Sequence, residues 1–240
     1  MDIGKCAKDA WGLFRIDLGP LIAAALIAAV VWNIAVAIVG LAVFGGVGLL
    51  GDISRGVAFG STFLGVALIA VIGILVYAWL YAVVFHMMLR RVREARPADY
   101  ADLRDFDQIG SFAVAGVVLG VIIAIGYSLL VIPGLFLTTI WLYSLPLIGD
   151  RRLALSDAMG TSKDLASAPG LFTTFATWLV GAVIVGVVIG ILQVIPVIGG
   201  LIGLLALPFG VGYVVSMYFQ ALGEGHLVTQ AVERATLGDR

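Results

Sequence analysis

The sequence predicts an all-α polytopic integral membrane protein, with six transmembrane helices and two interfacial amphipathic helices on the cytoplasmic side. Of its 240 residues, 62% are hydrophobic and only 12% are charged, and the mean hydropathy is +1.13. A water-soluble domain contains far more charge. No Asp, Glu, Lys or Arg occurs in 18–51, 56–89, 108–149 and 165–223. Because a helix needs ~20 apolar residues to cross the ~30 Å bilayer core, the first two windows hold one span each and the last two hold two each.

The elements follow in order from these windows. Apolar residues at helical spacing around Trp11 predict an amphipathic helix over residues 2–17 that lies in the membrane interface. A weaker apolar stripe predicts a second interfacial helix over about 151–166. The expected spans are 20–44, 62–89, 111–132, 135–149, 171–195 and 197–222. Residues 1–240 then form a single six-helix membrane domain.

Proline and glycine mark the expected connections, because proline removes an amide donor and glycine accepts turn conformations. We expect a tight hairpin at Pro133-Gly134, between the third and fourth spans. Another is expected at Pro196, between the fifth and sixth spans. The longer glycine-rich stretch 45–61 joins the first two spans.

The distribution of basic residues predicts the orientation of the chain. With the N-terminus inside, Arg55 alone among the 14 Lys and Arg residues falls outside. The inner thirteen are Lys5, Lys8, Arg15, Arg90, Arg91, Arg93, Arg96, Arg104, Arg151, Arg152, Lys163, Arg234 and Arg240. An excess of this size is a strong positive-inside signal. Both termini are therefore expected on the cytoplasmic side of a cytoplasmic membrane.

The predicted spans contain no charged residue, which argues against a transporter built on intramembrane carboxylates. Asn33 and Gln193 are the candidate intramembrane polar contacts. For both we favour interhelical hydrogen bonds, worth typically ~0.6 kcal/mol and up to ~2 kcal/mol, over a place in a polar cavity. Pro208 is expected to kink the sixth span.

A basic cluster follows the second predicted span. Arg90, Arg91 and Arg93 are candidate lipid-headgroup contacts, because basic residues at a membrane surface attract anionic headgroups at ~1 kcal/mol per charge. The same arginines also serve to set the orientation of the chain.

The residue inventory excludes several functional classes. Cys6 is the only cysteine, so neither an internal disulfide nor a cysteine-built metal site is expected. His86 and His226 are too few to form a metal cluster alone. Nucleophile-elbow and phosphate-loop motifs are absent, and a net charge of −1 gives no basic surface for nucleic acid. We therefore predict a protein that is not an enzyme and that uses no cofactor, metal ion or nucleic-acid partner.

The stretch 131–164 resembles a known pattern. It contains Val131-Ile132-Pro133-Gly134-Leu135, then Trp141, Pro146-Leu147, Asp150, Leu153, Asp157-Ala158 and Ser162. This pattern is similar to prokaryotic membrane proteins that include the membrane domain accompanying glycerophosphoryl diester phosphodiesterases and related stand-alone domains of unknown function.

The resemblance implies a six-helix domain in a prokaryotic cytoplasmic membrane, found with lipid-metabolising enzymes in some relatives. Its most specific motif here is Pro133-Gly134 followed by Asp157 and Ser162. The phosphodiesterase barrel and its metal-binding residues are absent from this chain, so no hydrolase activity is implied. Asp and Ser hydrogen-bond readily to nearby backbone, and we expect Asp157 and Ser162 to cap or brace the cytoplasmic helix.

These observations support a leading hypothesis and two alternatives. The leading hypothesis is a non-enzymatic membrane protein that organises or handles lipid, with membrane lipids as its partners. The first alternative is an accessory or scaffold subunit of a larger complex, with other membrane-protein subunits as partners. The second is a facilitative transporter of a small or amphipathic solute, whose path passes Asn33, Gln193 and Pro208.

Overall fold

The structure is a computed structural model that describes residues 1–41, 55–104, 106–192 and 196–238. Regular structure in these residues is entirely helical, which confirms the predicted all-α fold. The helices are α1 (Ile3–Ile16), α2 (Leu18–Gly40), α4 (Arg55–Glu94), the 3₁₀ helix η2 (Tyr100–Arg104), α5 (Phe106–Leu129), α6 (Val131–Ile140), α7 (Ser144–Arg151), α8 (Leu155–Ser167), α9 (Leu171–Leu192), α10 (Pro196–Ala221) and α11 (Gly225–Gly238).

Three helical segments among the described residues are long and apolar enough to cross a membrane. They are α2, the part Leu64–Glu94 of α4, and the run Val131–Arg151 that comprises α6 and α7. A fourth span would need α8 and α9 together, although these two helices meet at a bend of 97°. Apolar helices of this length fit the predicted membrane location.

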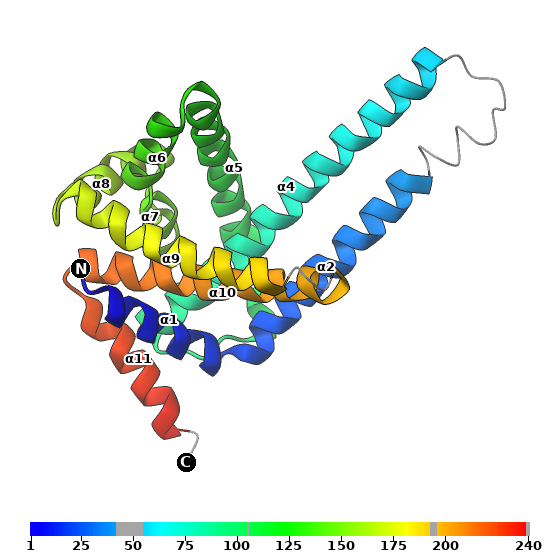
Figure 1. Cartoon of the computed structure of the whole chain (residues 1–240). Coiled ribbons are helices and arrows are strands. Elements are labelled where there is room, and N and C mark those ends of the chain that lie inside the picture. The colour runs from blue at the N-terminus through cyan, green and yellow to red at the C-terminus, as the bar shows by residue number, and fades with distance from the viewer. Residues whose placement is uncertain (42–54, 105, 193–195, 239–240) are drawn as a thin grey trace.

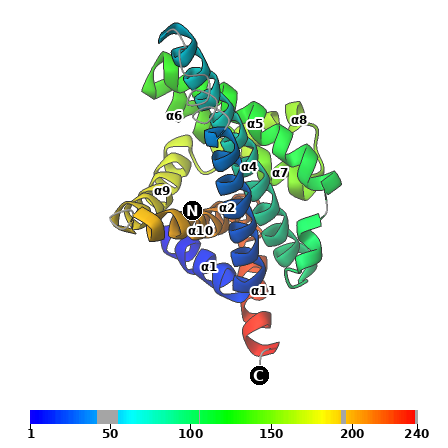
Figure 2. The ribbon, with the colours of Figure 1, turned by 90° about the vertical axis from the view of Figure 1, so that its right-hand side faces the viewer.

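The helices do not form one parallel bundle. Figure 1 and Figure 2 show three pairs that diverge from a common base: α2 with α4, α5 with α6, and α9 with α10. At the base, α1 packs chiefly against α10, and α10 also contacts α4. The C-terminal helix α11 packs beside α1 and α10.

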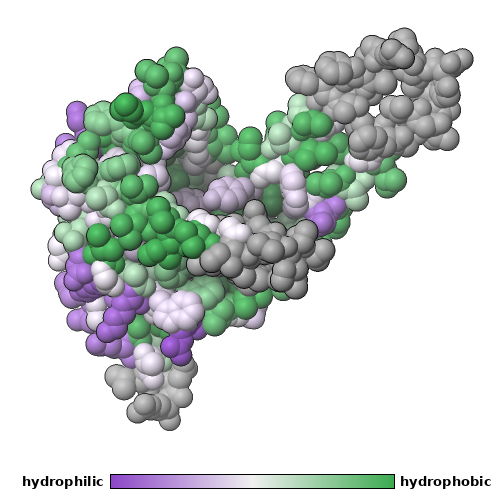
Figure 3. Space-filling view, in the orientation of Figure 1, coloured by the Kyte–Doolittle hydropathy of each residue, from purple (hydrophilic) through white to green (hydrophobic). Residues whose placement is uncertain are grey.

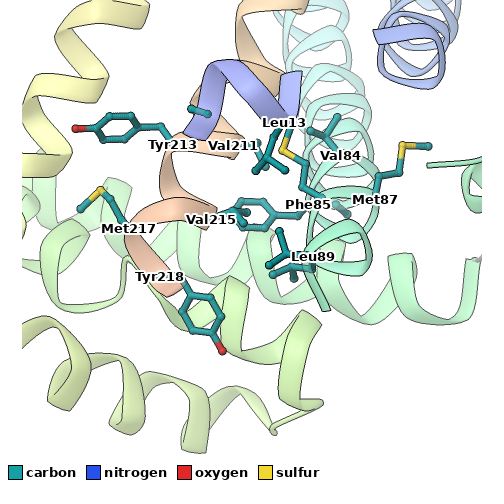
Figure 4. Close-up of a cluster of buried hydrophobic side chains, with 14 of the residues drawn as sticks. Leu13, Val84, Phe85, Met87, Leu89, Val211, Tyr213, Val215, Met217 and Tyr218 are labelled. Atoms are coloured by element: carbon teal, nitrogen blue, oxygen red, sulfur yellow. The ribbon is translucent and has the colours of Figure 1, made fainter. Parts of the chain in front are cut away.

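The hydrophobic core lies at the base, near the arginine-rich end of α4. Figure 4 shows Leu13 of α1, Phe85 of α4 and Val215 of α10 in one cluster, and all three are fully or almost fully buried. Arg90 and Arg93 follow Phe85 on α4 by five and eight residues.

The outer surface of the diverging pairs is apolar. Large hydrophobic side chains such as Ile38 of α2, Leu64 of α4 and Val114 of α5 are well exposed. Figure 3 shows hydrophobic residues over α5, α6 and the described part of α4, while hydrophilic residues gather near α1 and α11. Such a division suits helices surrounded by lipid with a base at the water interface.

The helix at residues 2–17 forms as expected, but much of it is buried in protein. Its side chains Cys6, Asp9, Ala10 and Leu13 pack inward, whereas Trp11 remains 53% exposed and contacts Phe14. The side chain of Asp2 caps the helix by accepting a hydrogen bond from the Lys5 amide at 3.0 Å. The amphipathic spacing therefore reflects a stripe that faces the protein, with Trp11 on the exposed side.

The break after α5 differs from the predicted position. The sequence placed it at Pro133-Gly134, but the chain turns at Leu130, whose backbone is extended. Pro133 lies in the first turn of α6, where its missing amide hydrogen costs no helical hydrogen bond. Gly134 lies inside α6 against Tyr127, whose ring would be 2.4 Å from an added Cβ atom. Glycine is required here for close helix packing rather than for a turn.

The second proline hairpin agrees more closely with its prediction. Helix α9 ends at Leu192 and α10 begins at Pro196, so this proline also occupies a first helical position. Helix α10 continues through Pro208. Gln193 and most of the glycine-rich stretch 45–61 lie outside the described residues. Helix α11 had no counterpart in the sequence analysis.

Candidate functional site

A large apolar cavity lies between the diverging helices. Its volume is about 870 Å³, which falls in the ~300–1,000 Å³ range of ligand pockets. Residues of α2, α4, α5, α6, α7, α9 and α10 line it, together with residues between α6 and α7. Among them are Trp32, Gly73, Ile74, Tyr77, Tyr81, Phe112, Gly116, Gly120, Ala124, Thr138, Trp141, Leu145, Trp178 and Val214.

One stripe of α4 forms one wall of this cavity. Its lining residues recur at intervals of three or four, from Ala70 through Ile74 and Tyr77 to Tyr81. In an α-helix this spacing places side chains on one face. The cavity therefore runs along α4 for about three turns, roughly 16 Å.

Aromatic side chains with a polar edge are prominent in the wall. They are Trp32 of α2, Tyr77 and Tyr81 of α4, Trp178 of α9, and Trp141 at the junction of α6 and α7. The Trp32 ring lies against Gly73, where an added Cβ atom would be 2.8 Å from it. Tyr and Trp are common at membrane interfaces, where they usually face headgroups. Here they surround an internal space.

A smaller polar pocket of about 290 Å³ lies next to the cavity. Its lining residues are His86, Leu89, Arg90, Arg93, Glu94, Gly149, Asp150 and Arg152. Phe112 lines the apolar cavity, and its ring would be 3.0 Å from a Cβ atom added at Gly149 of the polar pocket. Leu145 and Gly149 are one turn apart on α7. The two spaces are thus neighbours, separated by the Phe112 ring.

The three arginines predicted as headgroup contacts are joined to carboxylates. Arg90 pairs with Glu94 at 3.2 Å and with Asp102 at 3.0 Å. Arg91 lies 3.6 Å from Asp17, with both side chains almost buried. Each guanidinium carries five N–H donors, so these pairs leave further donors, and contact with lipid headgroups stays a prediction for all three.

Arg93 is the most heavily engaged of the three. Its guanidinium donates to both carboxylate oxygens of Asp150 and to Glu224, each at 2.6 Å. The same group stacks 4.8 Å from the ring centre of Phe219, and Tyr218 donates to Asp150 at 2.8 Å. This cluster connects α4, α7 and the end of α10. Arg152, by contrast, forms no ion pair with any described residue.

A second polar cluster lies between α1 and α10. Ser216 donates a hydrogen bond to the Asp9 carboxylate at 3.2 Å, and both residues are buried. Burial raises the pKa of Asp9 above its ordinary value. Burial also raises the pKa of the Cys6 thiol to about 11, so this cysteine is neutral and unreactive at physiological pH. Neither residue lines the apolar cavity.

The intramembrane amides are not part of the cavity wall as far as the structure describes them. Asn33 donates its amide hydrogen to the Ala29 carbonyl oxygen at 2.8 Å, one turn back in the same helix. The predicted interhelical hydrogen bond is therefore not the one this side chain makes. Gln193 lies outside the described residues.

The motif that carried the family resemblance has a structural explanation. Ser162 is fully buried in α8 and donates to the Ile140 carbonyl oxygen at 2.7 Å, while its oxygen accepts from the Tyr143 amide at 3.0 Å. It thereby braces the interruption between α6 and α7. Asp157 lies exposed in the first turn of α8, where a negative charge suits the helix dipole.

Comparison of the chain with protein-family models, with curated proteins and with solved structures found no match. The fold and cavity place the chain in a broad class: all-α proteins whose apolar helices are long enough to span a membrane. Among the described residues, no three His, Cys, Asp or Glu side chains converge as a metal site would require.

The cavity is not predictable from the sequence alone. Its aromatic residues lie inside charge-free windows, where Trp and Tyr stand out from Leu, Val, Ile and Ala. That signal was available, but it could not show that residues as distant as Trp32 and Trp178 face one space. The cluster of Arg93, Asp150 and Glu224 was also not predicted, because its members are far apart in the sequence.

Proposed function

We propose that this protein handles lipid in a membrane, without enzymatic activity, and that its apolar cavity holds a lipid acyl chain. The observation that carries the proposal is the cavity of about 870 Å³, lined by apolar and aromatic side chains and placed along the membrane-spanning part of α4. A neighbouring polar pocket with three arginines lies toward the charged end of that helix.

An apolar cavity of this size is unfavourable when it is empty. Atoms lining an unfilled apolar space lose dispersion contacts on one side, and water gains few hydrogen bonds there. In a membrane the most abundant apolar molecule is the lipid chain. Since the bilayer is equally apolar, the hydrophobic effect does not drive entry, so packing and shape must retain the chain. We therefore expect moderate affinity and exchange with bulk lipid.

The proposal includes six membrane crossings, with both termini cytoplasmic in a prokaryotic cytoplasmic membrane. Thirteen of the 14 basic residues on one side support this orientation. The family resemblance supports the prokaryotic location and the association with lipid metabolism. The basic residues then lie at the cytoplasmic headgroup region.

Filling the cavity tests the proposal. Gly120 lines the cavity, and a Cβ atom there would meet no other atom within 4 Å. The variant Gly120→Leu therefore places its side chain in the cavity without a backbone clash. We expect it to lose the phospholipid that the wild-type protein retains through gentle extraction, as measured by native mass spectrometry.

Gly186→Leu is the matched control. Gly186 is exposed on α9, has the same open surroundings and does not line the cavity. It should retain lipid like the wild type, with a similar thermal midpoint for all three proteins. Equal lipid retention by Gly120→Leu and wild type would reject the cavity as a lipid site.

The headgroup contacts form a separate part of the proposal. Changing Arg90, Arg91 and Arg93 together to Gln should reduce retention of anionic phosphatidylglycerol relative to neutral phosphatidylethanolamine. The change removes up to three attractions of ~1 kcal/mol each. Unchanged retention in a variant with intact topology would show that headgroups are held elsewhere.

An accessory-subunit function is the second candidate, and one observation favours it. The pair α2 and α4 projects away from the other helices (Figure 1), and it exposes large apolar side chains such as Ile34, Ile38 and Val66. A partner helix could pack there through close contacts. Migration of the natively extracted protein with a second, stoichiometric protein would favour this candidate, and migration as a monomer would count against it.

A further inference from the structure

Resting on the proposed function, we propose that the cavity recognises its lipid through a carbonyl oxygen at the root of the apolar chain. The hydroxyl groups of Tyr77 and Tyr81 donate hydrogen bonds to that oxygen. The ligand class is thus an uncharged carbonyl attached to a long apolar chain. Ester-linked glycerolipids and isoprenoid quinones both carry this chemistry.

The two tyrosines form a paired element in the cavity wall. They are one turn apart on α4, both line the cavity, and their rings stack at 6.2 Å with an interplanar angle of 19°. Tyr81 continues the aromatic series through Phe85 to Phe112, at ring distances of 4.9 and 5.5 Å. Their positions are therefore set by packing and do not depend on a flexible loop.

Neither hydroxyl is used by the protein as far as the structure describes it. Tyr77 and Tyr81 make ring contacts, but they form no hydrogen bond with any described residue. The other tyrosines packed among these helices do find partners. Tyr213 donates to the Thr177 carbonyl oxygen at 2.9 Å, and Tyr218 donates to Asp150 at 2.8 Å.

An unpaired hydroxyl away from water is costly, because it gives up hydrogen bonds to water without a replacement. Tyr77 is 58% exposed, but on a membrane-spanning part of α4 its surroundings are the cavity and lipid tails, which offer no acceptor. A ligand that brings an acceptor oxygen into the cavity removes this cost at both tyrosines. The two unpaired donors therefore point to a ligand with a polar atom at this depth.

The absence of charged side chains in the cavity wall determines which kind of acceptor fits there. The described lining residues include no Asp, Glu, Lys, Arg or His, so a phosphate or carboxylate placed there would lack a counter-charge. A carbonyl oxygen is neutral, only accepts hydrogen bonds and fits two phenol donors.

The position along α4 agrees with the order of groups in a lipid. Tyr81 precedes Arg90 by nine residues, which is about 13 Å along a helix. The arginines mark the headgroup end, the tyrosines come next, and Ile74 and Ala70 line the cavity farther along. Headgroup, carbonyl and chain follow one another in the same sequence.

The test compares lipids that differ only at the carbonyl. The probes are dioleoyl phosphatidylglycerol with two ester bonds, and its dialkyl ether analogue with the same headgroup and chains. The wild-type protein in nanodiscs should prefer the ester lipid about tenfold by competitive native mass spectrometry, as expected for one to two net hydrogen bonds. Menaquinone, added as a third probe, identifies a quinone as the ligand source if it displaces both phospholipids.

The variant Tyr77→Phe/Tyr81→Phe removes only the two hydroxyl groups. In this variant the ratio of ester to ether binding should fall to about two or less. If a quinone is the ligand source, menaquinone should no longer displace the phospholipids. Tyr100→Phe is the matched control, because Tyr100 lies in η2, does not line the cavity and is exposed. The single Phe variants serve if the double variant has a lower thermal midpoint.

The outcomes separate this inference from the proposed function. Equal binding of ester and ether lipids, with no quinone displacement and no effect of the Phe changes, overturns carbonyl recognition while leaving lipid binding intact. Failure of the proposed function gives a different result, since Gly120→Leu would then leave binding of every probe unchanged.

Discussion

At the scale of single residues, Asp9 is a buried carboxylate whose burial opposes its charge. Its pKa is raised by desolvation, and the hydrogen bond from Ser216 only partly offsets this effect. The folded protein therefore holds the proton more tightly than the unfolded chain does. This proton-linked stabilisation is complete below the unfolded value of ~3.9 and is lost as pH rises through the raised folded pKa. At neutral pH the charged form reduces stability.

We accordingly predict that Asp9→Asn stabilises the protein at pH 7.5. The amide oxygen still accepts from Ser216, and no charge is buried, so the thermal midpoint should rise by about 2–4 °C. The gain should be smaller at pH 4.5 than at pH 7.5, because the raised pKa of Asp9 makes the wild-type carboxylate easier to protonate as pH falls. Thermal scans in detergent at both pH values measure this, with the exposed Asp157→Asn as control. A lower midpoint for Asp9→Asn at pH 7.5 would show that the charge itself is required.

Arg93 is the residue on which most charge-assisted contacts converge. It forms a bidentate hydrogen bond with Asp150 and a further hydrogen bond with Glu224. The Asp150 side chain is only 4% exposed, so the opposite charge of Arg93 compensates for the burial of this carboxylate.

Removing the guanidinium should therefore leave a buried, unpaired carboxylate. We predict that Arg93→Ala lowers the free energy of unfolding by about 2–3 kcal/mol, less than for a fully buried pair because Arg93 is partly exposed. Arg96→Ala, at a more exposed set of ion pairs, should cost less than about 1 kcal/mol. Denaturant titration of purified protein gives both values. Equal, small losses would mean that the Arg93 cluster adds no stability.

At the scale of elements, the junction of α6, α7 and α8 depends on one hydroxyl. Ser162 satisfies an amide and a carbonyl group that the break between α6 and α7 leaves without helical partners. The sequence predicts that Ser162 caps or braces its own cytoplasmic helix. The hydroxyl instead reaches across to a different one, which depends on how α8 docks.

We predict that Ser162→Ala destabilises the protein by about 1–3 kcal/mol, because two buried backbone groups lose their partner. Local hydrogen exchange should rise at Tyr143 more than at the ends of α10. Ser156→Ala, exposed on the same helix, should change stability by less than about 0.5 kcal/mol. If Ser162→Ala behaved like Ser156→Ala, an unseen partner such as water would have to take over both contacts.

Helix positions were more predictable than helix breaks. The charge-free windows located α2, α4, α5, α9 and α10 within several residues at their described ends, because charge is excluded from lipid. The turn at Leu130 was misplaced at Pro133, since proline is tolerated in a first helical turn as well as in a loop. Helix α11 was missed because its polar composition resembles a tail.

At the scale of the whole molecule, the number of crossings decides where the C-terminus lies. Three candidate spans would place the two termini on opposite sides, whereas the proposed six crossings place both in the cytoplasm. We predict that a green fluorescent protein fused after Arg240 fluoresces in bacterial cells, and that alkaline phosphatase fused after Arg152 is inactive. Phosphatase fused in the stretch 45–61 should be active. An active fusion after Arg152 would reject the six-crossing topology.

The sequence alone determined that this protein has apolar helices separated by charged segments. This can be recognised position by position along the chain, because a charged residue within lipid is costly and is therefore absent from the spans. The tertiary structure decided which faces meet. Within a membrane helix both the protein side and the lipid side are apolar, so no periodicity identifies the inner face. The cavity along α4 and the Arg93 cluster, with partners 57 and 131 residues away, arise from packing between distant segments.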